Sequence, residues 1–501
     1  MKTVCLLAAG LGTRMGKFAG NINKTMLPVN NKAIISHIIE QFPIDTRFVV
    51  ALGFKGIDVK SYLRIAHPKN NFKFVEVDNF QGEGSGPGYS VSCCKPYLEK
   101  EFLLIACDAL YEGLNDIPTW HNFMGVSEID PSETPAYCNV KTDDNKNVIL
   151  IKDKVQCDYT LAATGVWAIN DTNKFWEDLE TSELSTGFKR ISFKAYKMGW
   201  IDLGTIKKYE DYVKQSVAYD FSKPDEMLYF VGKRVIKWFR DEKSTVNRIT
   251  RSLRIRDFPF TECIGRHLIY HDFVPGKTLN EYQDVELLPK LAKYMRERIW
   301  CVPTRELLTV QDMRSFYMDK TMERVAKFET KYPDFTVSKI NSNLVSSDIY
   351  KALMKIDWLS ICTKDLEFRS RPIHGDLQFD NIIYDDATDK ITLIDWRQDF
   401  GGRVDVGDIY YDMAKLIAGS IINYAKIKAG EFTYTEDGDK IKYEIRDHIA
   451  FKTDLVKKAF DITDPIIDQL VTLVFLNMAP LHHPPFDKIL YCIALERLNQ
   501  L

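Results

Sequence analysis

The stretch RPIHGDLQFDN, residues 371–381, places an aspartate and an asparagine five residues apart. The run ITLIDWR, residues 391–397, adds a second aspartate at the end of a segment typical of a β-strand. Asp376, Asn381 and Asp395 therefore supply carboxylate and amide oxygens, which are ligands that Mg²⁺ accepts in proteins. The pattern predicts a site that handles magnesium and ATP in the second half of the chain.

A different sequence pattern, also typical of phosphate binding, lies near the N-terminus. LLAAGLGTRMG, residues 6–16, is typical of a buried strand that enters a glycine-rich loop carrying Arg14, and Lys24 follows ten residues later. Glycine lets backbone N–H groups approach phosphate oxygens closely, while arginine and lysine add positive charge for a triphosphate. The spacing matches neither the Walker loop nor the dinucleotide-binding GxGxxG pattern. We therefore expect a second, distinct nucleotide site.

Composition narrows the class of protein. The chain has 501 residues, of which 45% are apolar, enough for about two to four packed domains. Its 70 acidic and 67 basic residues nearly cancel, so we expect no nucleic-acid partner. The longest apolar run, residues 470–481, is shorter than the roughly 20 residues of a membrane-spanning helix, so no membrane span is expected. Ten cysteines without CxxC spacing indicate a cytoplasmic protein without a zinc or disulfide framework; a homo-oligomer stays open.

The order of the patterns predicts two domains. Up to about residue 212, short apolar runs alternate with helical segments, which predicts an α/β fold with a Rossmann-like, mixed and mainly parallel sheet. After the polar, proline-containing stretch 217–227, a β-rich portion precedes mostly helical sequence. We therefore predict a first domain over residues 1–218 and a second over residues 225–501.

Five segments of the first half resemble the sugar-phosphate and phosphocholine nucleotidyltransferases. The glycine loop at 6–16 is followed in that family's order by KTMLPV (24–29), LLIACDAL (103–110), ATGVWAI (163–169) and GWIDLGT (199–205). The resemblance implies transfer of a nucleotidyl group to a phosphomonoester. It also implies these roles: catalysis by Arg14 and Lys24, nucleotide contacts by Ala9, Gly10, Gly12, Thr13, Arg14 and Gly86, an acceptor contact by Gly165, and Mg²⁺ ligation by Asp108 and Asp202.

The nucleobase is left open by the sequence. The family's usual base-reading segment corresponds here to GEGSGPGYS, residues 82–90, which departs from the usual pattern at 85–88. This difference leaves the identity of the nucleobase undecided, but it does not change the type of reaction that the resemblance implies.

The second half resembles the aminoglycoside phosphotransferase and choline/ethanolamine kinase superfamily. The resemblance rests on HGDLQFDN, the later LIDWR and GDIYYDMAKL (407–416). It implies a bilobal, protein-kinase-like fold in which Asp376 is the catalytic base and Asn381 and Asp395 bind Mg²⁺. Further implied roles are structural for His374, Asp408 and Asp412, and ATP binding for Lys237, which we prefer to Lys233. The next helix lacks the glutamate that usually pairs with this lysine, and Glu242 and Glu262 are the alternatives.

Together the two patterns predict a bifunctional enzyme. A kinase would phosphorylate a small alcohol with ATP, and a nucleotidyltransferase would couple the resulting phosphomonoester to a second NTP, with Mg²⁺ at both sites. We rank CTP and a choline- or ethanolamine-like alcohol first, as a donor for surface glycans or lipid head groups. Trp396 is a candidate contact to a cationic head group, together with Trp358, Tyr410 and Tyr411, although aromatic side chains also suit a core.

Three alternatives stay open. A sugar kinase joined to a sugar-1-phosphate nucleotidyltransferase would make an NDP-sugar. A pseudokinase would regulate the nucleotidyltransferase or bind a ligand, which the missing helix glutamate favours. Antibiotic phosphorylation is disfavoured, because a resistance kinase has no use for the first half.

Overall fold

The structure, a computed structural model, describes residues 3–117, 121–216, 225–255, 257–445 and 450–501. Contacts divide them into two compact units, the first made of 3–216, 225–242 and 263–270, the second of 243–262 and 271–501. The stretch 217–227, where we expect the domain boundary, falls mostly outside the described residues. Across these residues, no helix combines the length and the apolar character that crossing a membrane requires.

The first unit is built on a nine-stranded sheet whose central strand is β1 (Thr3–Ala8). β1 runs parallel to both of its neighbours, β4 (Arg47–Leu52) and β6 (Phe102–Ala106), and β5 (Asn71–Glu76) continues the parallel part. β11 (Leu161–Ile169) is antiparallel to β6 and makes the sheet mixed. The expected Rossmann-like mixed sheet is confirmed. Four outer strands complete it: β8 (Phe123–Glu128), β9 (Cys138–Thr142), β10 (Val148–Asp153) and β12 (Lys194–Lys197).

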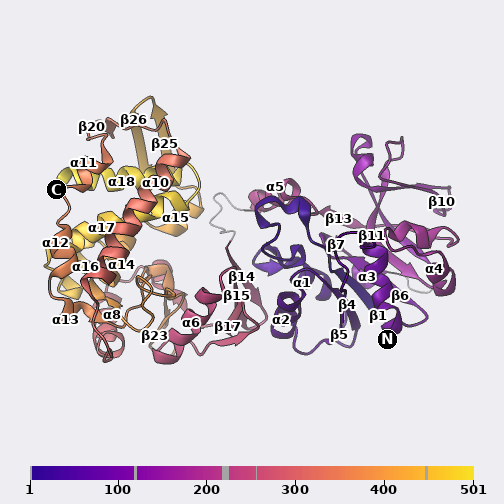
Figure 1. The fold of residues 1–501 in the computed structure, drawn as a ribbon, viewed down its shortest axis with the longest axis horizontal. Helices are drawn as coiled ribbons and strands as arrows, with labels where there is room; N and C mark the ends of the chain where they lie inside the picture. The colour runs from indigo at the N-terminus through magenta and orange to yellow at the C-terminus, as the bar shows by residue number, and fades with distance from the viewer. Residues whose placement is uncertain (1–2, 118–120, 217–224, 256, 446–449) are drawn as a thin grey trace. The chain divides into compact units, whose positions relative to one another are not determined.

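Both faces of this sheet are covered, as the apolar run in β1 requires. Leu6 belongs to the core beneath α1 (Ile34–Ile39) and α2 (Gly56–Ala66), whereas Cys5 belongs to the core beneath α3 (Pro87–Cys94) (Figure 1). Successive strand residues point to opposite faces, so an unbroken apolar strand is stable only between two layers. Other elements of the unit are β2 (Pro28–Val29), β3 (Lys32–Ala33), β7 (Ala109–Glu112), β13 (Gly199–Asp202), α4 (Thr172–Asp178) and α5 (Ile206–Ser216).

A four-stranded sheet, whose first two strands are antiparallel, also packs largely with the first unit. Tyr229 and Trp238 on its first two strands are fully buried; the Tyr229 hydroxyl donates to the Met26 carbonyl at 2.7 Å and the Trp238 indole N–H donates to Asp58 at 3.1 Å. The sequence assigned these strands to the kinase half, and the division at 218/225 stays a prediction. The strands, in sheet order, are β14 (Glu226–Val231), β15 (Arg234–Phe239), β17 (Leu268–Asp272) and β16 (Glu262–Ile264).

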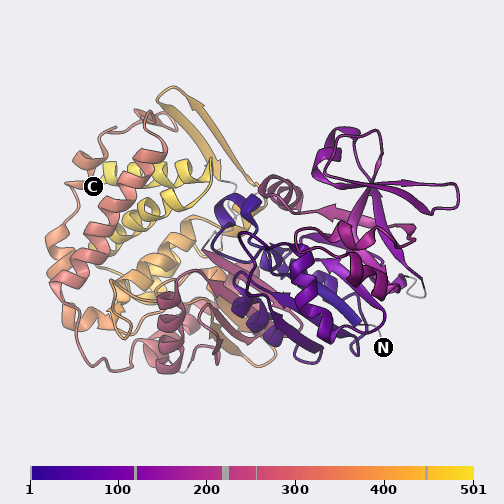
Figure 2. The same ribbon diagram turned by 45° about the vertical axis from the view of Figure 1, so that its right-hand side comes forward.

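The second unit is mostly helical, as the kinase-like expectation requires. Its central helix α14 (Ile409–Ile421) is buried at all but one position and packs against α17 (Pro465–Met478), which in turn packs against α18 (Phe486–Gln500). A helix buried on every side forms the core of its domain. Figure 2 shows the long hairpin of β25 (Phe432–Asp437) and β26 (Lys440–Ile445), which is tied to α18 by a 2.6 Å bond from the Tyr443 hydroxyl to Glu496.

Smaller elements surround this core. A three-stranded sheet consists of β18 (Lys277–Thr278), β22 (Ile382–Asp385) and β23 (Lys390–Leu393), and β21 (Ser370–Arg371) pairs with β24 (Gly407–Asp408). The pair β19 (Lys339–Ile340) and β20 (Asn343–Leu344) extends the hairpin sheet. The other helices are α6 (Glu242–Arg254), α7 (Leu279–Tyr282), α8 (Leu287–Tyr294), α9 (Val310–Met313), α10 (Lys320–Lys331), α11 (Ile349–Leu353), α12 (Trp358–Thr363), α13 (Leu366–Arg369), α15 (Tyr424–Lys428) and α16 (Thr453–Phe460).

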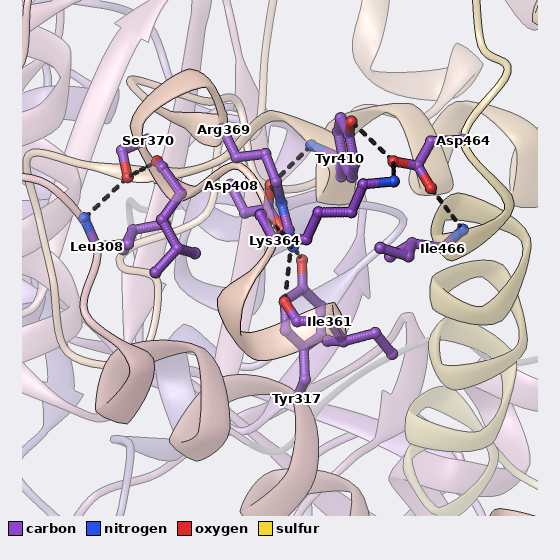
Figure 3. A network of polar contacts seen from close by, with 11 residues as sticks. Leu308, Tyr317, Ile361, Lys364, Arg369, Ser370, Asp408, Tyr410, Asp464 and Ile466 are labelled. Carbon is purple, nitrogen blue, oxygen red and sulfur yellow. Dashed lines mark hydrogen bonds and ion pairs between the residues drawn. The ribbon is translucent and has the colours of Figure 1, made fainter. Parts of the chain in front are cut away.

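A buried ion pair fixes the start of α14 (Figure 3). Arg369 and Asp408 are both fully buried and lie 2.5 Å apart. Asp408 also accepts bonds from the Tyr317 hydroxyl at 2.7 Å and from the backbone N–H of Tyr410 at 3.0 Å, so it caps the helix. Asp408 therefore has the structural role expected from the sequence.

Removing the arginine would leave the buried Asp408 carboxylate without its cation. We predict that Arg369→Met lowers the free energy of unfolding by about 3–5 kcal/mol, measured in urea by circular dichroism and tryptophan fluorescence. The control is Arg314→Met, whose 60%-exposed side chain faces Asp319, and its effect should stay below about 1 kcal/mol. Equal, small effects of the two changes would contradict the role given to the pair.

Candidate active sites

The first candidate site begins where β1 ends. Ala9 is buried, and its carbonyl accepts the backbone N–H of Phe54 at 3.0 Å, which anchors the glycine loop to the turn after β4. Gly12 has a positive φ of 64°, and a Cβ there would meet the Lys24 side chain at 3.4 Å. A short 3-10 helix, Thr13–Phe18, then carries Arg14. The loop is therefore wrapped closely around the stem of Lys24.

Lys24 and Asp108 form the centre of this site. The Lys24 ammonium lies 2.5 Å from a carboxylate oxygen of Asp108, which follows β6. Burial alone would raise the pKa of the Asp108 carboxyl, but the charge and hydrogen bond of Lys24 and the charge of Arg14 outweigh burial and lower it. Asp108 therefore stays ionised and suited to a metal cation.

Asp202 approaches the same point from β13. A Cβ at Gly204 would lie 3.0 Å from Asp202 Oδ1 and 3.5 Å from both Asp108 Oδ2 and a terminal nitrogen of Arg14. These three charged groups therefore converge around Gly204, where a side chain would crowd them. The structure brings together Arg14, Lys24, Asp108 and Asp202, which the sequence proposed as one site.

Lys208 is a member of this site that the sequence reading missed. It projects from α5, and its ammonium lies 3.0 Å from Asp202 and 3.1 Å from Glu133. The Tyr137 hydroxyl donates to the same Asp202 oxygen at 2.7 Å. The available signal was the pair of lysines, Lys207 and Lys208, directly after GWIDLGT.

Gly86 and Gly165 have packing reasons to be glycine. A Cβ at Gly86 would lie 2.4 Å from the Ser182 carbonyl oxygen, and one at Gly88 would lie 1.9 Å from that of Glu180. Gly165 has a φ of 94°, and its Cβ would meet that of Ala106 at 2.9 Å. Their contacts to nucleotide and acceptor stay predictions.

The second candidate site centres on Asp376. The Lys415 ammonium on α14 lies 2.7 Å from Asp376 Oδ1, and the Asn381 amide donates to the Asp376 carbonyl at 2.8 Å. Burial would raise the pKa of the Asp376 carboxyl, yet Lys415 outweighs burial and lowers it. Lys415 is therefore a further residue that the sequence reading did not assign.

Asp412 and His374 hold this loop in place. Asp412 accepts the backbone N–H groups of His374 at 2.8 Å and Gly375 at 2.7 Å and the Trp300 indole N–H at 3.1 Å. Burial raises the pKa of the Asp412 carboxyl to about 6 despite these bonds. The His374 ring donates from Nε2 to the Ile394 carbonyl at 2.8 Å and accepts at Nδ1 from the loop, as expected of a structural residue.

Asp395 follows β23 in an unusual backbone conformation, with a φ of 57°. Its carboxylate lies 3.1 Å from the guanidinium of Arg248 on α6. Arg248 also donates to the Trp396 carbonyl, and the Trp396 indole N–H donates to the Arg248 carbonyl at 2.9 Å. Helix α6 begins at Glu242, whose carboxylate lies 3.4 Å from Arg266, and the residue of this helix that faces Asp395 is Arg248.

Trp396 and Lys237 are both buried, and the structure shows protein contacts for each. Trp396 is 2% exposed and its ring stacks on Phe258 with centroids 4.5 Å apart. Lys237 lies on β15 in the first unit, with its ammonium 3.9 Å from Glu226. Trp396 therefore supports the loop after Asp395, and ligand contacts of both residues stay predictions.

The acidic residues fit Mg²⁺ as partial ligand sets. In the part of the chain that the structure describes, no three His, Cys, Asp or Glu side chains gather into a metal centre. Asp108 with Asp202, and Asn381 with Asp395, would each give two oxygen ligands and leave the others to phosphate and water, which is the usual arrangement for Mg²⁺. The convergence around Gly204 supports the fit at the first site.

Residues 259–434 match the model of a family described as Phosphotransferase enzyme family. The matched range contains Asp376, Asn381, Asp395 and helix α14. The match supports a phosphotransferase-type second half. The resemblance stated for the second half is confirmed.

Two curated relatives match part of the chain. The Bifunctional protein GlmU of Methanocaldococcus jannaschii is 29% identical over 196 residues, which are 38% of this chain and 45% of the relative. The GlmU of Methanococcus vannielii is 26% identical over 219 residues, 40% of this chain and 51% of the relative. The chain spans about half the length of these relatives.

Solved structures also resemble part of the chain. UDP-glucose pyrophosphorylase complexed with UDP-glucose is 17% identical, with a TM-score of 0.37, and the match covers 43% of this chain and 98% of that one. HddC from Yersinia pseudotuberculosis is 20% identical, with a TM-score of 0.35, and the match covers 43% of this chain and all of that one. The curated relatives agree with the nucleotidyltransferase resemblance of the first half.

We predict that His374 stays neutral in mildly acidic solution. Burial lowers the pKa of its ring to about 4, so the unfolded chain takes up the proton first, and this group weakens the folded state as the pH falls from about 6.5 towards 4. Nitrogen-15 NMR of labelled histidine, assigned with His374→Gln, should show one Nε2–H tautomer at pH 5.5. A ring that titrates near pH 6.5 would contradict the buried, loop-holding role.

Proposed function

We propose that the chain is a bifunctional enzyme that phosphorylates a small alcohol and then couples the phosphomonoester to a nucleotide. The observation that supports this most is the presence of two separate acidic sites, one in each compact unit. Asp108 and Asp202 meet Arg14 and Lys24 in the first unit, while Asp376 lies beside Asn381 in the second. Each arrangement has the charges that its reaction needs.

In the kinase reaction, the acceptor hydroxyl attacks the γ-phosphorus of ATP and ADP leaves. Asp376 would orient this hydroxyl and accept its proton, because its lowered pKa keeps the carboxylate ionised. Its bonds to Lys415 and Asn381 fix where the carboxylate points. Mg²⁺ bound by Asn381 and Asp395 would supply positive charge for the phosphates.

In the nucleotidyl transfer, a phosphate oxygen of the monoester attacks the α-phosphorus of an NTP and pyrophosphate leaves. Both reactants are anions, so their repulsion contributes to the barrier. Arg14 and Lys24 would lower it by neutralising the triphosphate, and Asp108 and Asp202 would hold Mg²⁺. The position of Lys208 beside Asp202 adds a further cation to the same site.

The two reactions fit in series, since the product of the first is the substrate of the second. We take CTP as the first nucleotide to test and a CDP-linked small alcohol as the product, made in the cytoplasm for surface glycans or lipid head groups. A sugar kinase coupled to a sugar-1-phosphate nucleotidyltransferase is the alternative within the same class.

A second candidate is a nucleotidyltransferase with a pseudokinase domain that regulates it or binds a ligand. The ion pair between Arg248 and Asp395 favours this candidate, because a metal-binding aspartate is here engaged by an arginine. Release of ADP by the purified chain would exclude it.

We predict that two substitutions separate the activities. Asp376→Asn should lower ADP release by about 100- to 10,000-fold while pyrophosphate release from a supplied phosphomonoester and NTP stays unchanged. Asp108→Asn should have the reverse effect, and each variant is the matched control of the other. Coupled assays of ADP and pyrophosphate, run across the four NTPs, measure both. Loss of both reactions in either folded variant would contradict two separate sites.

A further inference from the structure

Cationic side chains gather beside the proposed catalytic base. Lys415 contacts Asp376 directly at 2.7 Å. Lys320 and Arg397 both face the ring of Phe316, with the ammonium 3.5 Å and the guanidinium 5.1 Å from its centroid. The backbone N–H of Arg397 donates to the His374 carbonyl at 3.0 Å, so this residue lies against the catalytic loop.

These cations are close enough to repel one another. Burial lowers the pKa of the Lys320 ammonium, and the charges of Arg397, Arg324 and Lys415 lower it further, while Asp399 opposes them. Lys415 is paired with Asp376, whereas the charges of Lys320, Arg324 and Arg397 are offset only in part by Asp399 and Glu323, which leaves a surplus of positive charge. An anion bound among them would relieve this repulsion.

The aromatic rings proposed for a cationic ligand face the protein's own cations. The ring of Tyr411 has the Lys320 ammonium at 5.6 Å, and the ring of Tyr410 has the Arg369 guanidinium at 4.7 Å. Trp396 is buried against Phe258. A choline-like head group would need such ring faces for itself and would meet repulsion here.

We propose that the acceptor alcohol is an anion, carrying a carboxylate or a phosphate beside the hydroxyl that is phosphorylated. This inference rests on the proposed kinase function and names its substrate class. Lys320 and Arg397 hold the anionic group, with Arg324 close by, and Asp376 takes the hydroxyl proton. The carboxylate or phosphate of the acceptor strengthens its binding and orients its hydroxyl, and it takes no part in the phosphoryl transfer itself.

A matched set of acceptors tests the charge preference. The full chain is incubated with Mg-ATP and one acceptor at a time, and ADP release is measured. In the first group, neutral glycerol is compared with glycerate and glycerol 3-phosphate; in the second, neutral glucose is compared with glucuronate and glucose 6-phosphate. Choline is the cationic acceptor. We expect an anionic member to exceed its neutral counterpart in kcat/KM by about tenfold or more, and the carboxylate and phosphate arms distinguish the two anions. If choline or a neutral compound is the best acceptor, the inference of an anionic acceptor is overturned, while the proposed kinase function remains supported. No ADP release with any member would overturn the kinase assignment itself.

Substitutions then locate the anionic group. Lys320→Gln and Arg397→Gln should each raise the KM for the best anionic acceptor by about tenfold, with a smaller change in the KM for ATP. The control is Lys327→Gln on the same helix, whose exposed side chain pairs with Glu323 and should leave both KM values unchanged. If either variant fails to fold by circular dichroism, Arg324→Gln replaces it. An equal rise in the KM for ATP would assign the cluster to nucleotide phosphate and contradict the proposal.

Discussion

A carboxylate that loses its water must be paired with a cation or accept hydrogen bonds, and this constraint organises both halves of the molecule. Lys24 pairs with Asp108 in the first unit, and Lys415 pairs with Asp376 in the second. In each case the cation outweighs burial and lowers the carboxyl pKa. Asp108 and Asp376 therefore stay charged, as a metal ligand and a catalytic base must be. Lys24 and Lys415, which pair with them, are also the cations that a bound phosphate or acceptor would contact.

The surroundings of the acidic side chains in the second half separate those with a structural role from the one proposed to act in the reaction. Asp412 is fully buried and saturated by N–H donors, so it shapes the loop, whereas Asp376 is partly exposed and contacts a lysine. Asp408, buried with Arg369, fixes the helix that carries both Asp412 and Lys415. The ion pair in the core thus positions the groups at the site, although it touches no substrate.

The sequence predicts best what is local along the chain. Asp376 and Asn381 contact each other over five residues, and their spacing alone indicated the loop. The pairing of Arg248 with Asp395 spans 147 residues and depends on how α6 packs, which no spacing shows. The same holds for β14, whose Tyr229 reaches Met26 across 203 residues and draws the strand into the first unit. The sequence alone does not separate a ligand contact from a core position for Trp396, because an aromatic side chain suits both, and only the structure shows that its ring is buried against Phe258.

Transfer of a labelled phosphate tests the tandem account most directly. The chain is incubated with Mg²⁺, ATP labelled in its γ-phosphate, unlabelled CTP and an alcohol that supports ADP release, and the products are separated. The account predicts label in a nucleotide-linked product, in the phosphate farther from the nucleoside, because that phosphate comes from the kinase reaction. Label that stays in ATP, inorganic phosphate or the monoester, both with CTP and when GTP or UTP replaces it, would contradict the account.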